Sequence, residues 1–387
     1  MTETATATPT PDALASVLAD APFVRLVATD DGDAVAAAGT LAGALRERAV
    51  PFHVRVTRDP VPDAGDDEVA VTVGTGVGPH SIPGTSRPAS TTAFAVAREL
   101  GGDPDPVVAL AGGVAAGSVP GTDGTGDALE AAERAGSVAR RPGVAIPCAD
   151  LADGLSASTL VRTPYSGDPE ATRAALAPLD LPATRDDDAH RRLASLVAVD
   201  VAAAEAASDR APSAVERALR PYAMDGSVPT APFETIGGYA DVLDVLAREA
   251  PGTAVALALS TDPSDGLVST ARDAWREHGL EAHRALDAAT TGRYDGCVVA
   301  RVDASPPTLP TIARLVREFR SPEPVVVVLD ESSGRIAAAA TESMGLGDVC
   351  RSVAAEFGGD GWGADTRGGI ETEADPTDAL AALREAL

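Results

Sequence analysis

The sequence predicts an α/β protein of two domains, each built on a sheet of parallel type, with a helical connector between them. Three observations support this prediction. Short apolar segments alternate with segments of helical period up to about residue 116, the part from about 168 to 224 is rich in Ala, Leu and Arg, and strand-like segments return after residue 232. Such alternation is typical of doubly wound sheets. The 387 residues suffice for two or three domains at roughly 150 residues each.

We expect the first domain to span residues 21–165, after a flexible N-terminus at 1–20. An apolar strand at 23–28 leads into a turn rich in aspartate. Apolar residues then recur at the spacing of a helix, at Val35, Ala38, Leu41 and Leu45. The pattern further predicts strands at 52–56 and 68–73, a helix at 91–100, an apolar segment at 107–116 and a loop at 117–126.

The helical connector is expected at 166–230 and the second α/β domain at 231–387. In that domain the pattern predicts strands at 253–259, 294–302 and 324–329 and helices at 267–277 and 308–319. A glycine-rich segment at 358–364 indicates a backbone loop, because so many glycines leave few side chains there. A short strand-like tract and a terminal helix from Thr377 complete the prediction.

The composition predicts a salt-loving protein. The formal net charge is −27, from 58 acidic and 31 basic residues, and every basic residue is Arg. Molar salt screens such self-repulsion, because it shortens the Debye length to about 3 Å. The absence of Lys excludes a Walker A loop and Schiff-base catalysis. Since Asn is absent too, a protein kinase of the usual type is excluded.

Cysteine usage and hydropathy point to the cytoplasm. Cys148, Cys297 and Cys350 lie far apart, which excludes paired zinc or redox motifs and suits buried thiols in a reducing compartment. The N-terminus lacks the features of a signal peptide. We expect no membrane partner, because no segment approaches the ~20 apolar residues of a membrane span.

Three aspartates follow the first predicted strand and form a candidate metal site. Asp31 and Asp33, with Asp30 as a further candidate, lie at the carboxyl end of that strand, where open parallel sheets bind ligands. Carboxylate oxygens in one tight turn suit Mg²⁺ or Mn²⁺. The alternative is that Asp33 caps the following helix while its neighbours are solvated.

Other motifs are absent: Pro79 interrupts a dinucleotide-type glycine pattern, and the five histidines show no metal-binding spacing.

Residues 27–38 resemble the first motif of the DHH phosphoesterases, the family that includes the RecJ exonucleases. Asp31 and Asp33 match its Asp-x-Asp, so the resemblance implies that they hold one of two Mn²⁺ ions. Residues 109–115 and 150–159, with 166–168 after them, are similar to archaeal RecJ-like proteins.

The C-terminal half resembles the family's DHHA1-like substrate-binding domain, whose signature is a Gly-Gly-His loop. Here Asp360 stands where that signature has His. Backbone N–H groups of such a loop can bind phosphate. The candidate phosphate- or nucleic-acid-binding residues are therefore Gly358, Gly359, Gly361 and Arg367. Arg140, Arg141, Arg314 and Arg317 are further candidates for nucleic-acid contacts, against the alternative of surface salt bridges.

The sequence departs from the family where hydrolysis needs ligands. Gly74 and Thr75 stand where a metal-binding Asp is expected, Ala116 replaces another, and residues 78–81 take the place of the Asp-His-His triplet. Two-metal hydrolysis requires both ions about 3.5–4 Å apart. We therefore expect no required cofactor and at most one Mn²⁺ or Mg²⁺, bound weakly by Asp31 and Asp33 in a solvent-open cleft.

The resemblance implies a catalytically degenerate RecJ-like protein of a haloarchaeon. We expect a structural or single-stranded-DNA-guiding factor in replication or repair that is not an enzyme. The implied partners are replication or repair proteins such as GINS and MCM, because a eukaryotic member of the family without an active site serves the replicative helicase with them. The alternatives are an active metal-dependent single-strand exonuclease and a small-molecule phosphoesterase.

Overall fold

The computed structural model describes residues 10–62, 64–65, 67–182, 185–219, 221–224 and 232–387. The chain divides into two compact units, both discontinuous in sequence. The first unit comprises Met1–Arg141, Ala145–Ala149 and Pro221–Trp275, and the second comprises Pro142–Val144, Asp150–Arg220 and Arg276–Leu387. In the described residues no helix is both long and apolar enough to cross a membrane.

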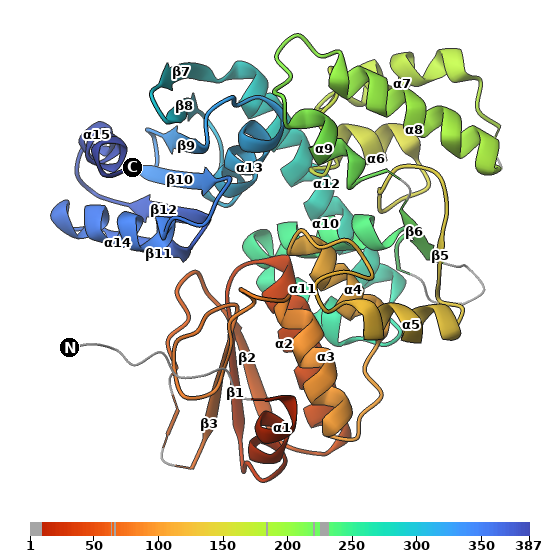
Figure 1. Ribbon diagram of the computed structural model, residues 1–387, viewed down its shortest axis with the longest axis vertical. Helices are drawn as coiled ribbons and strands as arrows, with labels where there is room; N and C mark the ends of the chain where they lie inside the picture. The colour runs from red at the N-terminus through yellow and green to blue at the C-terminus, as the bar shows by residue number, and fades with distance from the viewer. Residues whose placement is uncertain (1–9, 63, 66, 183–184, 220, 225–231) are drawn as a thin grey trace. The chain divides into compact units, whose positions relative to one another are not determined.

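The first unit contains a parallel sheet of four strands in the order β2-β1-β3-β4 (Figure 1). The central strand β1 pairs in parallel with β2 and β3, and β3 pairs in parallel with β4. This confirms the predicted parallel sheet and its first three strands. The strands are β1 Val24–Ala28, β2 Phe52–Val56, β3 Val69–Val73 and β4 Ser81–Ile82.

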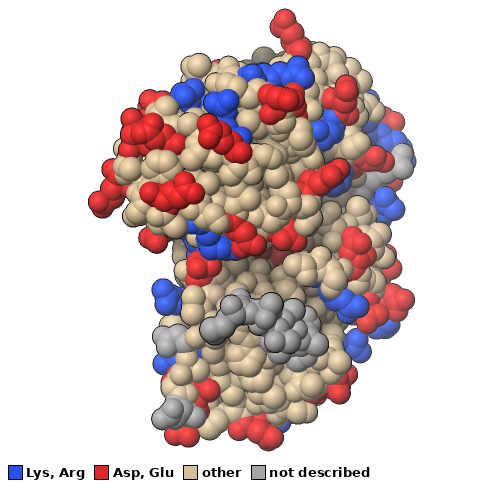
Figure 2. Space-filling model, turned by 60° about the vertical axis from the view of Figure 1, so that its left-hand side comes forward, with Lys and Arg blue, Asp and Glu red and all other residues tan. Residues whose placement is uncertain are grey.

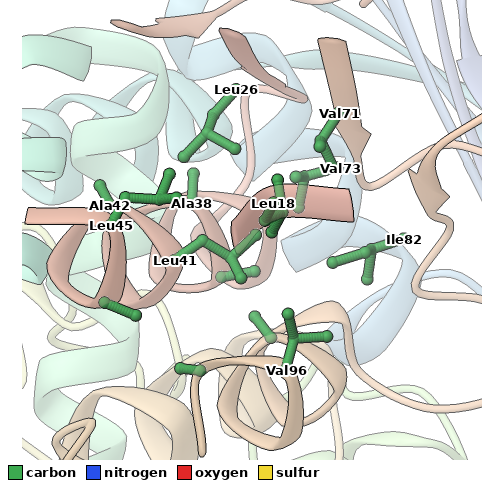
Figure 3. Close-up of a cluster of buried hydrophobic side chains, with 14 of the residues drawn as sticks. Leu18, Leu26, Ala38, Leu41, Ala42, Leu45, Val71, Val73, Ile82 and Val96 are labelled. Atoms are coloured by element: carbon green, nitrogen blue, oxygen red, sulfur yellow. The ribbon is translucent and has the colours of Figure 1, made fainter. Parts of the chain in front are cut away.

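One face of this sheet packs against three helices. These are α1 Pro11–Ala19, α2 Gly32–Glu47 and α3 Ala89–Glu99. Figure 3 shows their apolar side chains meeting those of the sheet, among them Leu18, Leu26, Leu41, Val73 and Val96. The prediction of a flexible segment at 1–20 is wrong for α1, where Leu14 and Leu18 are buried; residues 1–9 lie outside the described part.

Further helices of the first unit pack against α2 through small residues. A side chain at Gly39 would meet Ala258 Cβ at 2.5 Å, and one at Gly112 would meet Ala36 Cβ at 2.7 Å. The prediction of a strand at 253–259 is wrong, because Pro251 begins a helix there. The elements are α4 Pro106–Ala115, α5 Gly126–Arg134, α10 Ile236–Glu249, α11 Pro251–Leu259 and the antiparallel pair β5 Val138–Arg140 and β6 Tyr222–Met224. Residues of α12, Asp265–Ala288, occur in both units.

The second unit contains a mixed sheet of six strands in the order β11-β12-β10-β9-β8-β7. Only β8 and β9 pair in parallel within this sheet, so the predicted parallel type holds for the first unit and not here. The predicted strand at 294–302 is interrupted by a turn. The strands are β7 Thr290–Tyr294, β8 Cys297–Val302, β9 Val325–Asp330, β10 Arg335–Ala340, β11 Asp360–Ala364 and β12 Arg367–Glu371.

Helices cover both faces of the mixed sheet, which is why every residue of β9 is buried. Alternate strand residues contribute to one apolar cluster with α14 Leu346–Glu356 and α15 Pro376–Ala386. Helix α13, Leu309–Phe319, packs against β9 and β10. The segment predicted as a helical connector contains helices and ends in strand β6, and its residues up to 220 belong to the second unit. The other helices are α6 Leu151–Ala157, α7 Pro169–Leu176, α8 Asp187–Ala202 and α9 Ala211–Glu216, with short 3₁₀ turns at Ala177–Leu179 and Pro306–Thr308.

Candidate functional site

Asp31 lies where β1 ends and α2 begins. It is the N-cap residue of α2, and its Oδ1 accepts a hydrogen bond from the Ala34 N–H at 3.0 Å. The hydroxyl of Thr29 donates to its Oδ2. An aspartate at the N-cap satisfies a backbone donor that the helix leaves unpaired. Both carboxylate oxygens of Asp31 are therefore engaged within the first unit.

Asp33 lies in the first turn of α2 but caps a different helix. Its Oδ2 accepts from the Ala89 N–H at 2.6 Å and its Oδ1 from the Ser90 N–H at 2.9 Å, the first two residues of α3. The alternative that Asp33 caps the helix following it is therefore wrong. Asp31 caps α2, and Asp33 caps α3 and so joins α2 to α3. Burial and the nearby charge of Asp31 raise the pKa of Asp33 to about 7.

The two aspartates are not open to solvent. Asp31 is 9% exposed and Asp33 is 6% exposed. The expectation that they face a solvent-open cleft is wrong, because their carboxylates turn inward to the helix ends that they cap. Asp30 is partly exposed and lies 3.9 Å from the Arg58 guanidinium.

No room exists for a metal ligand at position 74. Gly74 has φ +83°, a conformation that favours glycine, and the Cβ of any other residue would overlap Thr29 Oγ1 and approach Ala34 Cβ to 3.1 Å. Thr29 Oγ1 is the group that donates to Asp31. A side chain at position 74 would therefore displace the Thr29 hydroxyl and break its hydrogen bond to Asp31.

The donor set does not fit a two-metal centre. All four oxygens of Asp31 and Asp33 accept hydrogen bonds from this chain. Across the described residues, no group of three or more His, Cys, Asp or Glu side chains is placed to hold an ion. One weakly bound ion at Asp31 and Asp33 stays a prediction.

Titration with Mn²⁺ in molar KCl is expected to give a weak isotherm, because an ion must displace hydrogen bonds that cap two helices. The Asp33→Asn variant should lower the melting temperature, because its amide oxygen can accept from only one of the two N–H groups at the start of α3, and a helix cap contributes about 1 kcal/mol. For each of the two proteins, addition of Mn²⁺ or of a chelator should leave its own melting temperature unchanged. Two tight sites that disappear in Asp31→Asn would contradict this prediction.

The glycine-rich segment is a strand and a helix end, so the loop predicted at 358–364 is wrong for β11. Gly358 has φ +66° and follows the last turn of α14. Its N–H donates to the Ala355 carbonyl, and that of Gly359 donates to the Ala354 carbonyl, which is a Schellman helix ending. These two N–H groups are therefore already used.

Gly361 occupies a different position in the same segment. A side chain there would overlap the backbone of α14 at Cys350 and Arg351, so glycine lets β11 lie directly on that helix. Ala364 and Arg367 flank a two-residue turn and form a hydrogen-bonded pair of the β11–β12 ladder. Because hydrogen-bonded and non-bonded pairs alternate along such a ladder, Gly361 and Ile370 form a non-bonded pair. The N–H of Gly361 therefore points away from β12, toward the free edge of the sheet.

Sequence reasoning missed Trp362, which lies with Arg367 on the face of the β11–β12 hairpin that is turned away from α14, where both side chains are half-buried. Pairing in this hairpin places Trp362 opposite Gly369 and Ala364 opposite Arg367. A Cβ at Gly369 would meet the indole ring at 2.6 Å, so the ring lies close against that strand. The alternation of residues in a strand could have revealed this face, had the segment been predicted as a strand.

Three further candidate arginines, Arg140, Arg314 and Arg317, also make contacts within the protein. Arg314 donates to the Thr159 carbonyl at 3.0 Å and to its hydroxyl at 2.6 Å. Arg317 donates to the Ala340 carbonyl at 3.1 Å and to Glu318 at 2.9 Å. Arg140 lies over the ring of Tyr222. For Arg314 and Arg317 these contacts favour the salt-bridge alternative.

Comparison with known proteins identifies a full-length relative. The chain is 46% identical over 384 residues to the protein named "Uncharacterized protein rrnAC1427" of Haloarcula marismortui, covering 97% of this chain and 96% of that protein. The family model described as "Uncharacterized protein rrnAC1427, C-terminal domain" matches residues 289–385. This segment contains the whole mixed sheet, from β7 to β12, together with α13, α14 and nearly all of α15.

Solved structures share the fold at low sequence identity. CDC45 from Entamoeba histolytica matches with a TM-score of 0.60 and 9% identity, over 96% of this chain and 97% of that one. The exonuclease RecJ bound to manganese matches with a TM-score of 0.51 and 13% identity, over 100% and 96%. RecJ from Thermus thermophilus matches with a TM-score of 0.50 and 14% identity over 97% of this chain, which spans about half (52%) of that protein. The two α/β units thus have the RecJ and CDC45 fold.

Proposed function

This chain belongs to the family of the haloarchaeal protein rrnAC1427, and we propose that it is a catalytically degenerate RecJ-like protein, a structural or single-strand-guiding factor in DNA replication or repair. One observation carries the proposal. The fold of a manganese-binding exonuclease is present along the whole chain, while the matching aspartates cap helices and Gly74 leaves no room for a further ligand.

The conversion of Asp31 and Asp33 from ligands to caps supports a role without hydrolysis. A hydrolytic site needs carboxylates that can exchange solvent for metal and substrate. Here the same carboxylates hold the ends of α2 and α3 against the sheet. Loss of either carboxylate would therefore disturb the fold, so both aspartates have a structural role that needs no metal ion.

The β11–β12 hairpin is the surface that we propose for a single strand. Its edge presents the Gly361 N–H, and its face opposite α14 carries Trp362 and Arg367. Aromatic rings on which bases stack, next to a cation, are typical of proteins that bind single strands without sequence preference. The likeness to CDC45 supports partners of the GINS and MCM type, which the family resemblance implies.

Purified protein is expected to bind a labelled single strand in molar KCl with Mn²⁺ without degrading it, and tagged protein recovered from cells should bring replication or repair proteins with it. The Trp362→Ala variant should bind the strand several-fold more weakly, because base stacking contributes about 1–3 kcal/mol per base. Binding is measured by fluorescence anisotropy and degradation on denaturing gels.

The matched control for binding is Arg134→Ala, which removes a cation from the exposed surface of α5 and should leave strand binding unchanged. Degradation by the wild type that disappears in Asp33→Asn, with no replication or repair protein recovered, would instead establish the exonuclease. Turnover of small phosphodiesters alone would establish a small-molecule phosphoesterase.

A further inference from the structure

Strand β7 forms one edge of the mixed sheet and is exposed along its length. It is the last strand in the order β11-β12-β10-β9-β8-β7, and among the described residues it pairs with β8 alone (Figure 1). Thr290, Thr291, Arg293 and Tyr294 are exposed and Gly292 is partly exposed. An exposed edge strand can pair with another chain through its free N–H and C=O groups.

Features that commonly block such pairing are missing from β7. The strand contains neither proline nor a bulge, and each of its residues has a partner in β8. Its single charge, Arg293, is paired with Glu323 at 2.6 Å on the neighbouring part of the sheet. The opposite edge differs, because β11 carries Asp360 and glycines whose backbone lies on α14.

The ladder with β8 determines which groups of β7 face outward. Tyr294 pairs with Cys297 across a two-residue turn, and such a pair exchanges both of its hydrogen bonds. Because bonded and non-bonded pairs alternate in an antiparallel ladder, Gly292 and Thr290 also bond to β8. The N–H and C=O groups of Thr291 and Arg293 therefore point to the free edge.

We propose that β7 pairs antiparallel with β7 of a second copy of this chain, about a two-fold axis at Gly292. In this register Thr291 bonds to Arg293 of the second copy and Arg293 to its Thr291. Every outward N–H and C=O group of β7 then has a hydrogen-bond partner in β7 of the second copy. A C2 contact of this kind is self-complementary, as a closed homodimer requires.

Charge and side-chain size favour this register over its neighbours. Moving the axis to Arg293 would place two arginines directly opposite, which is destabilising, and moving it to Thr291 would need residues outside β7. At Gly292 the two strands form a non-bonded pair, in which Cα atoms approach to about 4.5 Å. The absence of a side chain on both copies suits that close approach.

The remaining side chains of β7 are compatible with the pairing. Tyr294 lies opposite Thr290 of the second copy, on the face where Arg384 of α15 covers the tyrosine ring at 3.5 Å. The large negative charge of the chain opposes association in dilute buffer and is screened in molar salt. The dimer is therefore expected in molar KCl and only at high protein concentration, because the few hydrogen bonds of the interface exceed the cost of association by a small margin.

Sedimentation equilibrium of the full chain in molar KCl is expected to show a mass that doubles as concentration rises. Thr291→Pro removes the interface hydrogen bonds that the Thr291 N–H donates while leaving the ladder with β8 intact, and it should keep the protein monomeric. Thr291→Ala retains the N–H and should dimerise like the wild type, so this pair of variants separates the backbone group from the side chain.

A second measurement uses Gly292→Cys, because the expected Cα separation lies within the range of about 4.4–6.8 Å that a disulfide bridges. Mild oxidation should link two copies of this variant through residue 292. The wild type is the control for linkage through its own thiols, of which Cys297 and Cys350 are buried and Cys148 is partly exposed. Any product that it gives must be subtracted, or removed with Cys148→Ser in both proteins. A wild type that stays monomeric at every concentration, together with Gly292→Cys that does not cross-link, would overturn the proposal and leave β7 to a different partner or to solvent.

Discussion

Dilution from about 3 M to about 0.1 M KCl is expected to unfold this protein. Its net charge of −27 is distributed over the surface, and Figure 2 shows Asp and Glu side chains spread across the visible face with basic side chains between them. The Debye length grows from about 3 Å at 1 M salt to about 10 Å at 0.1 M. At the lower salt each carboxylate therefore repels many others, and the compact state loses stability.

Circular dichroism during the dilution measures this effect as a loss of helical signal and of the cooperative thermal transition. Replacement of KCl by NaCl at equal ionic strength should leave the transition in place, since screening depends on ionic strength. An unchanged cooperative melt in about 0.1 M KCl would show that the acidic surface does not create a requirement for high salt.

The elements predicted correctly are those that carry their own periodicity. The apolar strand at 23–28 and the helix marked by Val35, Ala38, Leu41 and Leu45 have buried faces that a linear pattern shows directly. The segment at 253–259 lacks such information, because a short apolar run fits a buried strand and a buried helix equally well. Contacts with α2 decide its conformation, and these come from residues far away in sequence, such as Gly39 against Ala258.

The candidate site was predictable in its residues but not in their contacts. The turn that contains Asp31 and Asp33 follows from the strand before it. The partner of Asp33 is the start of α3, more than fifty residues further along the chain, and nothing in the local sequence indicates that distance. Likewise, the spacing of glycines at 358–363 cannot distinguish a flexible loop from a strand that glycine allows to lie on a helix.

A network of charges around Glu318 in α13 is a further feature that local sequence does not reveal. Glu318 is 9% exposed, and its carboxylate oxygens lie 2.8 Å from Arg217, 2.9 Å from Arg317 and 3.5 Å from Arg314. Burial alone would raise the pKa of Glu318, but the three guanidinium groups together lower it. One carboxylate thus neutralises cations from α13 and from the segment after α9.

The Glu318→Gln variant is expected to lose about 3 kcal/mol of stability, because it leaves three partly buried cations without their counter-charge. For a chain of 387 residues this corresponds to a melting temperature lower by roughly 4 °C, measured by calorimetry in molar KCl. The matched control is Glu170→Gln in α7, where an exposed carboxylate pairs with Arg173. Such surface pairs contribute at most about 1 kcal/mol.

The pH dependence of the same variant tests the electrostatic cause. Because the folded pKa of Glu318 lies below its ordinary value of 4.5, its charge stabilises the fold fully above that value, and the stabilisation is lost as pH falls through the folded pKa. The difference in stability between wild type and Glu318→Gln should therefore be constant near neutral pH and shrink in acid. A difference that is the same at every pH would indicate that packing of the side chain, and not its charge, holds α13 in place.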